Sequence, residues 1–308
     1  MNTIVVLLNW NSGEYTIPCI ESLLKSRVPP SKIIVIDNGS TDGSPERIDK
    51  EYPLVELIRN KYNVGFAAGS NQGIRRAIDL GADFVWLLNN DTLVDHECLG
   101  ELLKAARRFP TGACFSGKIY LANTNNVIWY AGGYRHCLNL GAYHSSRGQV
   151  DNDKQDEAKP VSFLSGCCML FPRWALDSLG LFIDDYFCFS EDNEWCWRAT
   201  SAGVQLFYVP SAKLWHHVSA SASKNDMAEG PSAIPAKSWY FLIRNHLWTV
   251  RLWAKPSIRK YIALIISFGG ELRMVVRNLL KADCEGASAV WKGMLDGIWK
   301  PVPRRDND

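Results

Sequence analysis

Residues 4–11, which read Ile4-Val5-Val6-Leu7-Leu8-Asn9-Trp10-Asn11, join a short apolar run directly to a polar end. Similar apolar runs follow, separated by stretches in which apolar residues have helical spacing, at 33–36, 55–58 and 84–88. Near-continuous apolar strands that alternate with amphipathic helices are typical of a parallel sheet covered on both faces. The sequence therefore predicts an α/β fold.

The rest of the chain is organised around this alternation. Helices are expected between the strands, at 14–25, 44–51, 67–80 and 95–109. The regularity fades after Ile119, and residues 122–160 predict a hairpin followed by a loop of the kind that covers a binding site. A second ordered stretch spans 161–218, and aromatic, basic helices follow from 231 onward. We expect a boundary near residue 225.

Composition is that of an ordinary globular protein, because 47% of the 308 residues are hydrophobic and 21% are charged. The nine cysteines include no Cys-x-x-Cys pair and have mostly apolar neighbours, which favours reduced thiols in the core over disulfides or a zinc site. The first apolar run is too short for a signal peptide. Residues 261–268, the longest later run, fall well below the roughly 20 residues that span a bilayer. We therefore expect a cytoplasmic protein without a transmembrane helix.

Polar residues gather where the predicted strands end. The first strand runs into Asn9 and Asn11, and the second into Asp37-Asn38-Gly39-Ser40-Thr41-Asp42. Residues 63–71 bring glycines and amides to a helix start, where backbone N–H groups can face phosphate. Ligands of open α/β sheets bind at the carboxyl ends of the strands, which makes these segments candidates for a ligand site. Taken singly, each also suits a tight turn with a helix cap.

The fourth strand is followed at once by Asn89-Asn90-Asp91. An unpartnered buried carboxylate costs several kcal/mol, so Asp91 needs a metal, a hydrogen-bond donor or solvent. Mg²⁺ and Mn²⁺ suit such a position, because Mg²⁺ commonly takes one or two carboxylates and completes its shell with water and phosphates. A helix cap ahead of residues 94–109 explains Asp91 equally well.

Together, the four segments resemble glycosyltransferase family 2, whose members carry Asn-Trp/Tyr-Asn, Asp-Asn-x-Ser-x-Asp, Asn-x-Gly-Phe-x-x-x-x-Asn and an acidic triplet in this order. The resemblance implies a GT-A fold, a mostly parallel sheet flanked by helices, and inversion at the anomeric carbon. It implies that Asp37 binds the nucleotide base and that Asp91 binds the metal. The other donor-binding residues that it implies are Asn9, Asn11, Gly65, Asn71, Asn89 and Asn90.

The triplet departs from the Asp-x-Asp of many relatives, which leaves one carboxylate and makes metal affinity depend on the bound diphosphate. This asparagine form looks more like the rhamnosyltransferase-like branch, a hint toward a dTDP-sugar donor. His216 and His217 begin a stretch similar to the His-x-x-Ser-x-Ser motif of the family, continued by Ser219 and Ser221. By its place there, His216 is the second candidate metal ligand. A histidine beside a tryptophan is also commonly a partly buried packing residue.

Residues 187–198 place Glu191, Asp192 and Glu194 at the start of a predicted helix. Ser190 as N-cap and a Glu194–Arg198 pair explain these acids without chemistry. The resemblance implies a different role, in which Asp192 is the general base and Glu191 orients it or the acceptor. Removing a proton from the acceptor and stabilising the leaving diphosphate are separate tasks for a carboxylate and a metal.

Residues 161–170 are similar to the strand and glycine turn that line the acceptor site in this family. Gly166, Cys167 and Trp195 are accordingly the implied acceptor-binding residues. No histidine and asparagine relay accompanies Cys167 or Cys168, so a covalent mechanism is not expected and packing is the simpler role.

The segment from 237 to 281 is strongly basic, with nine lysines and arginines against Glu271 alone, a net charge of 9 − 1 = +8. Tryptophans and tyrosines lie among these charges. A basic aromatic helix suits an anionic membrane surface. A helical bundle that packs on the catalytic domain explains the same pattern, and nucleic acid is disfavoured by the catalytic motifs. Arg244-Asn245 resembles an Arg-Asn element common in the relatives.

The sequence predicts a metal-dependent glycosyltransferase that moves a sugar from a UDP- or dTDP-sugar to a glycan or lipid-linked acceptor at the inner face of the cell membrane. The GT-A domain is expected at 1–225, with a nucleotide-sugar half at 1–118 and an acceptor half at 119–225, and a membrane-associating helical tail at 226–308. A non-catalytic nucleotide-sugar-binding protein and a sugar nucleotidyltransferase are the alternatives. The sugar, the linkage and the oligomeric state stay open.

Overall fold

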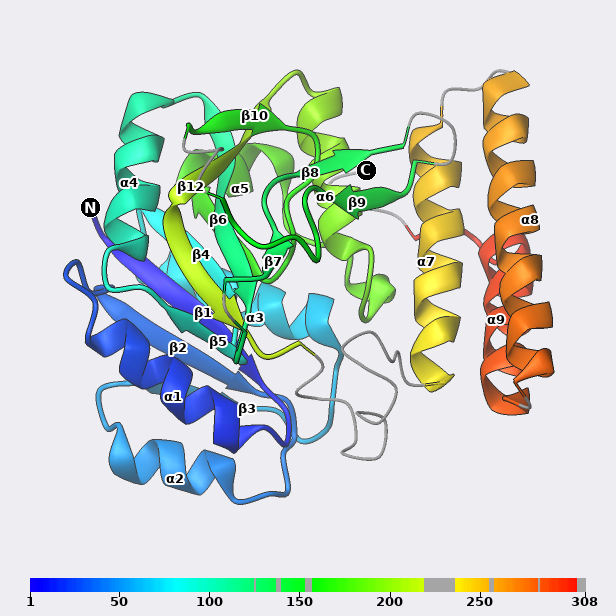
Figure 1. Ribbon diagram of the computed structural model, residues 1–308. Coiled ribbons are helices and arrows are strands. Elements are labelled where there is room, and N and C mark those ends of the chain that lie inside the picture. The colour runs from blue at the N-terminus through cyan, green and yellow to red at the C-terminus, as the bar shows by residue number, and fades with distance from the viewer. Residues whose placement is uncertain are drawn as a thin grey trace.

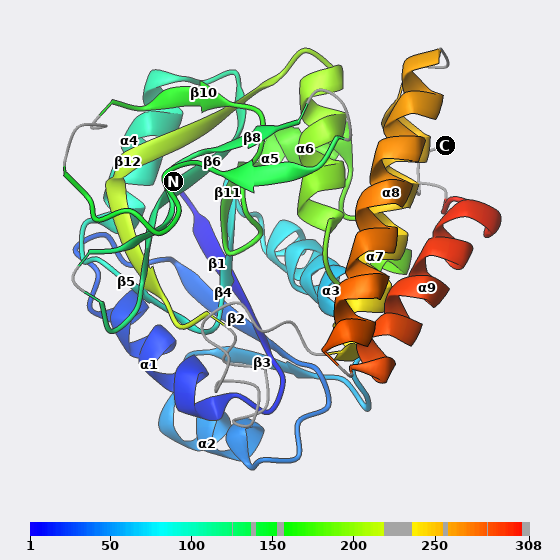
Figure 2. The same cartoon turned by 45° about the vertical axis from the view of Figure 1, so that its right-hand side comes forward.

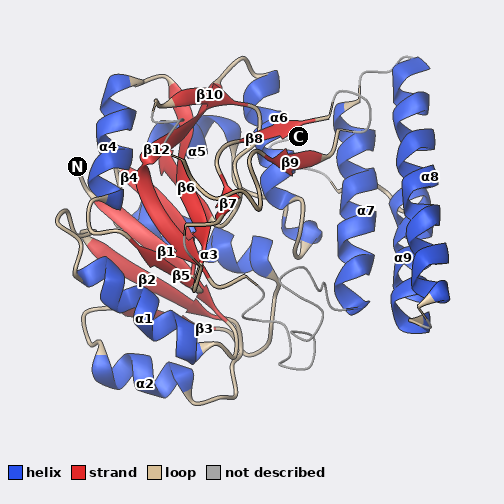
Figure 3. Ribbon diagram, in the orientation of Figure 1, coloured by secondary structure: helices blue, strands red, loops and turns tan. Residues whose placement is uncertain are grey.

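The computed structural model describes residues 1–124, 126–136, 140–152, 157–218, 236–254, 258–281 and 283–303. The expected boundary near residue 225, together with Ser219 and Ser221, lies outside these ranges. One large sheet forms the centre, with helices around it and three further helices at one side of the molecule (Figures 1 and 3). Within the described residues, no helix combines the length and the apolar character needed to cross a membrane.

The sheet has the order β10-β12-β6-β11-β4-β1-β2-β3 along its main path. The strands β1, β2, β3 and β4 are parallel, β11 is antiparallel to both neighbours, and β12 is again parallel to β6. Their bounds are Thr3–Asn9 (β1), Lys32–Asp37 (β2), Glu56–Arg59 (β3), Phe84–Asn89 (β4), Gly112–Leu121 (β6), Lys159–Val161 (β10), Cys168–Pro172 (β11) and Gln205–His216 (β12). The predicted mostly parallel α/β sheet is confirmed.

Short strands complete the sheet and a separate hairpin. They are β5 at Thr92–Val94, paired with β12; β7 at Ile128–Tyr130, paired with β6; and the β8–β9 hairpin of Gly133–Arg135 and Ala142–His144. The hairpin confirms part of the expectation for residues 122–160. The regularity fades about where the sequence predicted, because the strands between β6 and β11 are three residues long; the strand that the sequence did not predict is β6 itself, which ends at Leu121 beside β12. Its Ser116, Gly117 and Lys118 interrupt the apolar run that would have marked it.

The helices of the α/β part are α1 (Gly13–Leu24), α2 (Ser44–Glu51), α3 (Phe66–Asp79), α4 (Cys98–Arg108), α5 (Arg173–Leu179) and α6 (Glu191–Ser201), with a 3-10 turn at Asp184–Tyr186. The chain passes from β1 through α1 and α2 to β3 at one edge of the sheet, and then returns through α3 to β4 on the other side of β1. Because such crossovers are right-handed, α1 and α3 cover opposite faces (Figure 2). The strand order thus reverses between β1 and β4, which is where doubly wound sheets bind ligands.

Helix α4 begins three residues later than predicted, at Cys98 instead of Asp95. Residues 92–94 form β5 instead, in which Thr92 and Val94 pair with β12. Asp91 is therefore followed by a strand, and the explanation of Asp91 as a helix cap is wrong.

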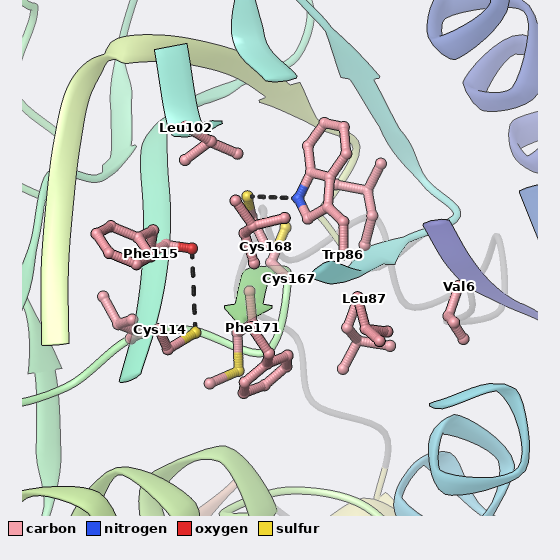
Figure 4. Packing of buried hydrophobic residues seen from close by; sticks show 14 of the residues in the cluster. Val6, Trp86, Leu87, Leu102, Cys114, Phe115, Cys167, Cys168 and Phe171 are labelled. Atoms are coloured by element: carbon pink, nitrogen blue, oxygen red, sulfur yellow. Dashed lines mark hydrogen bonds between the residues drawn. The ribbon is translucent and has the colours of Figure 1, made fainter. Parts of the chain in front are cut away.

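The core lies where β4, β6 and β11 meet. Figure 4 shows Trp86, Phe115, Cys168 and Phe171 packed together, with the indole Nε1 of Trp86 donating to Sγ of Cys168 at 3.3 Å. Burial raises the pKa of the Cys168 thiol, so the side chain is a neutral packing group there. Six of the described cysteines are fully buried and all eight are free. The six buried cysteines serve as small core residues.

The C-terminal helices are α7 (Ala236–Trp253), α8 (Ile258–Leu280) and α9 (Cys284–Trp299). Helix α7 lies against the α/β part, and α8 and α9 lie outside it (Figures 1 and 2). These helices have a small apolar cluster of their own, in which Ile243, Leu247, Val290 and Met294 are buried. The predicted C-terminal helical appendage is present.

Candidate active site

The carboxyl ends of β1 and β2 are joined through Asn9 and Asp37. Both residues are buried, and Nδ2 of Asn9 donates to Oδ1 of Asp37 at 2.8 Å. The backbone N–H of Ser40 donates to Oδ2 of Asp37 at 3.1 Å. Oδ1 of Asn9 accepts from the hydroxyl of Thr16 at 2.7 Å, which fixes the amide in turn. Asn9 therefore acts by holding the Asp37 carboxylate in one orientation.

Asn11 holds the loop after β2 from outside. Its backbone has a φ of 48°, in the left-handed region that asparagine tolerates. Oδ1 of Asn11 accepts from the backbone N–H of Thr41 at 2.7 Å, while its own N–H donates to Oγ of Ser40 at 2.9 Å. The exposed Asn11 thus closes the loop that carries Asp37.

Gly65 brings the start of α3 against the loop that precedes α6. Its φ is +92°, and a Cβ there would lie 2.6 Å from the carbonyl oxygen of Phe187. The N–H of Ala67 donates to that same carbonyl at 3.1 Å. Asn71, one turn further on, is fully buried, and its Nδ2 donates to the carbonyl of Phe182 at 2.8 Å. The loop before α3 is therefore packed directly on the loop before α6, and Asn71 supports that contact from within.

The three residues Asn89, Asn90 and Asp91 at the end of β4 have different surroundings. Asn89 is the last residue of β4, and its N–H donates to the carbonyl of Cys167 at 2.9 Å. Nδ2 of Asn90 donates to the hydroxyls of Ser12 and Thr16, at 2.7 and 2.6 Å. Asn90 thereby ties the end of β4 to the start of α1, and Asp91 is left to face β12.

Asp91 and His216 meet at this edge although 125 positions separate them in the sequence. Nε2 of His216 lies 3.0 Å from Oδ1 of Asp91, and both side chains are buried. Despite that approach, Oδ1 of Asp91 accepts no well-directed hydrogen bond within the described part of the chain. Nδ1 of His216 likewise has no hydrogen-bond partner there. His217 points elsewhere, with its ring against Tyr15.

This pair fits a divalent cation. Neighbouring ligands of an octahedral ion bound at about 2.1 Å lie about 3 Å apart, which is the spacing between Asp91 and His216. A buried carboxylate oxygen without a donor is also what a cation would satisfy. Within the described residues, no group of three acidic, histidine or cysteine side chains is placed to hold an ion. Diphosphate oxygens and water would therefore have to complete the shell.

Glu191 and Asp192, the acids for which the sequence predicted a role at the base, lie at the start of α6. The half-buried Asp192 accepts from the N–H of Gly166 at 2.8 Å and from the N–H of Asn193 at 2.7 Å. Glu191 is 5% exposed, and its Oε2 has no partner in the described chain. Burial, with the neighbouring Asp192 charge second, raises the pKa of Glu191 to about 8. Burial also raises the pKa of Asp192, although the two N–H donors oppose it.

The backbone before these acids is unusual. Phe187, Phe189 and Ser190 all have positive φ, at 63°, 67° and 67°. Ser190 lies at the N-cap position of α6, as expected, but its backbone is left-handed and its hydroxyl makes no cap hydrogen bond in the described chain. Positive φ costs on the order of 1–3 kcal/mol for each non-glycine residue, and such strain persists only where surrounding structure enforces it.

Helix α7 supplies that enforcement through Arg244 and Asn245. Nδ2 of Asn245 lies 2.8 Å from three carbonyl oxygens of the strained loop, those of Tyr186, Cys188 and Phe189. Nη2 of Arg244 donates to the carbonyl of Asp185 at 2.7 Å. The sequence marked Arg244-Asn245 as a family element but gave no sign of this contact, since about 50 residues separate it from the loop.

The three predicted acceptor residues lie in different surroundings. Gly166 contacts Asp192, and Cys167 is buried between the Asp192 and Asp91 sides of the site, bonded through its carbonyl to Asn89. Trp195 is fully buried, with its indole N–H donating to the carbonyl of Gly180 at 2.9 Å. The Gly166–Cys167 turn therefore bridges the two carboxylate groups, while Trp195 lies in the core beneath α6.

Trp129, on β7, was not among the residues that the sequence predicted for the site. Its ring packs edge-on against His216, with centroids 4.6 Å apart, and against His144 on its other side, at 4.5 Å. Burial lowers the pKa of His144 to about 4, so that ring is neutral. Trp129 thus limits how far the His216 imidazole can turn. Nothing in the irregular sequence around it marks this contact.

Known proteins are similar to this chain in sequence. The family model of glycosyl transferase family 2 matches residues 4–180. The N-acetylglucosaminyl-diphospho-decaprenol L-rhamnosyltransferase of Mycobacterium tuberculosis is 27% identical over 279 residues, covering 84% of this chain and 90% of that protein. The poly-beta-1,6-N-acetyl-D-glucosamine synthase of Staphylococcus aureus is 25% identical over 215 residues, covering 68% of this chain and 48% of the synthase.

Solved structures show the same fold. GalNAc-T7 with UDP, GalNAc and Mn²⁺ has a TM-score of 0.60 at 18% identity, over 82% of this chain and 48% of that one. A mannosyltransferase of Pyrobaculum calidifontis with GDP-Man and Mn²⁺ has a TM-score of 0.58 at 14% identity, over 97% and 87%. The chain spans about half the length of the synthase and of GalNAc-T7. The architecture is that of GT-A glycosyltransferases, and the chain belongs to glycosyl transferase family 2.

Proposed function

We propose that the protein transfers a sugar, with inversion, from a UDP- or dTDP-sugar to a hydroxyl group of a glycan or lipid-linked acceptor. The observation that carries this proposal is the turn at Gly166 and Cys167. One side of this turn donates to Asp192, and the other is bonded to the strand that presents Asp91. A base and a candidate metal ligand therefore flank one short segment. dTDP-rhamnose is the first donor to test, because the M. tuberculosis relative is named a rhamnosyltransferase.

On the donor side, Asp37 accepts hydrogen bonds from the nucleotide base. Asn9 and the N–H of Ser40 already hold its carboxylate, so little reorganisation is needed when the base binds. Asn11, Gly65, Asn71, Asn89 and Asn90 shape the walls of this pocket through the loop and helix contacts that they make.

Asp91 and His216 hold Mg²⁺ or Mn²⁺ in this proposal. When bound, the ion neutralises charge on the diphosphate and so stabilises the leaving group. Two of the structural neighbours were solved with Mn²⁺, which supports a divalent metal. Having one carboxylate, the site favours ion binding together with the nucleotide.

Asp192 is the general base. The acceptor oxygen forms a bond to the anomeric carbon while the bond from that carbon to the diphosphate oxygen breaks. The hydroxyl proton passes to Asp192, and the nucleoside diphosphate leaves with the electron pair. A raised pKa makes the Asp192 carboxylate a stronger proton acceptor than an ordinary aspartate. Glu191 and Gly166 orient it, and the buried Cys167 and Trp195 support the acceptor side from behind.

The proposed division is a GT-A domain at 1–225 and a helical tail at 226–308 that associates with an anionic membrane surface, with the protein peripheral at the cytoplasmic face. The separate apolar cluster of α7, α8 and α9 supports that division. The lipid-linked acceptor in the M. tuberculosis relative's name supports the membrane location.

The decisive experiment has two stages. Thermal unfolding with UDP, dTDP or GDP, each with Mn²⁺, identifies the nucleotide, because a ligand at 100 times its Kd stabilises by about 2.7 kcal/mol. The matching sugar nucleotide is then incubated with an N-acetylglucosaminyl-diphospho-prenol, and the anomeric configuration of the product is read by NMR. No stabilisation by any nucleotide, or a retained configuration, would contradict the proposal.

A further inference from the structure

Helix α8 exposes apolar residues on the face turned away from α7 and α9, and its inner face, which also carries apolar residues, buries three polar ones. Toward α7 and α9 it buries Ser267, Glu271 and Asn278, each 4% exposed. Its opposite face, which we call the outer face of α8, exposes Tyr261, Ile262, Ile265, Ile266, Leu272, Val276, Leu279 and Leu280. Ile265 is 70% exposed, where a water-facing helix of a globular protein would carry polar residues. An exposed apolar surface of this extent marks a contact with something apolar.

Helix α9 also exposes large apolar residues. Trp291, Leu295 and Trp299 follow each other at four-residue spacing, so they share one face, and they are 46%, 40% and 79% exposed. Figures 1 and 2 show α8 and α9 as the outermost elements, on the side away from the sheet. Neither helix covers these residues, and no other described segment does.

Charge distinguishes a membrane from a second copy of the chain. Arg273 and Arg277 on α8 are exposed, as is Lys281 directly after it, and the described α8 side chains include one acid, the buried Glu271. Two such faces would bring like charges together, whereas anionic headgroups attract them, and long basic side chains reach the headgroups while the apolar residues insert. Tyr261, Trp291 and Trp299 are residue types that favour the membrane interface.

We propose that the outer face of α8 lies in the surface of an anionic bilayer, with the helix parallel to the membrane plane. This inference rests on the membrane association proposed above. It differs in the cause of that association, which is the apolar face and not the basic charge of the tail as a whole. Arg244, which the basic-tail pattern counted among the membrane-facing charges, is 8% exposed and bonded to the loop before α6. The apolar face supplies the insertion, and the three exposed basic residues supply the preference for anionic lipid.

The test uses the full chain and vesicles of phosphatidylcholine with or without phosphatidylglycerol. The double change Ile265→Ser and Val276→Ser should weaken binding to the mixed vesicles by about tenfold or more, because buried apolar area sets interfacial affinity. Arg273→Gln with Arg277→Gln should remove the preference for phosphatidylglycerol. The control is Leu54→Ser, an 88% exposed leucine in the α/β part.

Nucleotide binding and melting temperature of each variant show that it is folded, and no transfer assay is needed, so the result is independent of the proposed reaction. Unchanged vesicle binding by Ile265→Ser/Val276→Ser would overturn the proposal. A parent that does not bind vesicles, but forms a dimer that this variant dissociates, would show that a second copy covers the face. Both outcomes refute membrane docking.

A second inference comes from independent contacts. We propose that Asn245 is a positioning residue for Asp192. Its Nδ2 is shared by three carbonyls of the loop that leads into α6, in which Phe187, Phe189 and Ser190 have positive φ. Releasing these carbonyls lets the loop relax and moves the start of α6. Arg244 assists from the next position, its guanidinium lying 4.1 Å from the ring of Trp248.

Asn245→Asp is the sharpest variant, because the carboxylate keeps the shape and cannot donate to carbonyls. It should lower kcat by about 10- to 100-fold and shift the pH dependence of kcat, with donor affinity unchanged, since misplacement of a base by about 1 Å has effects of that size. His246→Ala is the matched control, because this neighbouring, half-buried histidine contacts Ser267 of α8 and not the loop.

The two variants are compared at an equal loss of melting temperature. If Asn245→Asp then lowered kcat no more than His246→Ala does, Asn245 would be a structural residue, and this inference would be overturned. Asp192→Asn separates the two levels of the proposal. Activity retained by Asp192→Asn would refute the proposed base, whereas an inactive Asp192→Asn beside an unaffected Asn245→Asp would refute the positioning role alone.

Discussion

The donor side and the base side of the site are built in different ways. Asn9 and Asp37 hold each other across adjacent strands, and the carboxylate has donors before any ligand binds. On the base side, Glu191 is buried without a partner for one oxygen, and the strained loop ahead of it depends on Asn245, which lies more than 50 residues away. On the donor side, two neighbouring strands hold the carboxylate in place. On the base side, the position of the loop depends on contacts with a distant helix, α7. Changes on the two sides should therefore differ in kind.

The largest effect is expected from Asp192→Asn. The amide keeps the shape of the side chain but cannot take the acceptor proton, so the transfer rate should fall by about 10²- to 10⁴-fold while donor affinity barely changes. Transfer rate, nucleotide affinity and melting temperature are measured on one preparation. Asp185→Asn, an exposed aspartate in the same loop, is the control. Parental activity in a folded Asp192→Asn would move the base elsewhere, with Glu191 the next candidate.

Asp91→Asn should weaken nucleotide binding by about tenfold or more, and only when Mn²⁺ is present, because a neutral amide is a poor substitute for a carboxylate facing a divalent ion. Calorimetric titration with UDP or dTDP, with Mn²⁺ or with EDTA, gives the comparison. Asp83→Asn is the control, since Asp83 is exposed and directly precedes β4, whereas Asp91 follows its carboxyl end. An equal loss with and without metal would show that Asp91 binds the nucleotide directly.

Asp37→Ala should weaken nucleotide binding by about tenfold whether or not metal is present, since a hydrogen bond to a charged group contributes about 1.5–3 kcal/mol. The same titrations measure it. The change also leaves Asn9 without its acceptor, so the free energy of unfolding must be determined beside the affinity. Parental affinity in both buffers would remove Asp37 from the donor site.

The difference between the two sides also explains what the sequence could predict. The sheet and the segments at 9–11, 37–42 and 89–91 are local patterns of apolar strand and polar end, and the structure has them at those places. The meeting of Asp91 with His216 depends on β5 pairing with β12, a short strand that the sequence did not reveal. The support of α6 by Asn245, and the side of α8 that stays exposed, are set by the packing of distant segments. Such contacts have no local pattern.

The smallest expected effect is on stability, and it compares two buried glutamates. Burial raises the pKa of Glu271, on α8, to about 8, as it does for Glu191, and both Glu271 oxygens lack partners in the described chain. An ordinary glutamate loses its proton near 4.5, so between about pH 4.5 and 8 the folded protein holds protons that the unfolded chain has released. The free energy of unfolding must then fall with rising pH, by up to about 1.4 kcal/mol per pH unit for each group.

Glu271→Gln removes one of these protonation equilibria. Its stability should exceed that of the parent at pH 8 and approach it toward pH 5, while the transfer rate stays at the parental value. Glu191→Gln should show the same stability profile, because Glu191 is buried in the same way. It should also have a reduced transfer rate, because Glu191 lies next to the proposed base, Asp192. Urea unfolding of the two variants and the parent at pH 5, 6, 7 and 8 measures the slopes. A Glu271→Gln slope equal to the parent's would mean that Glu271 is hydrated in solution; equal transfer rates for the two variants would remove Glu191 from the site. Burial is the main cause of the raised pKa of both glutamates, and the surroundings of each carboxyl decide whether it serves the reaction.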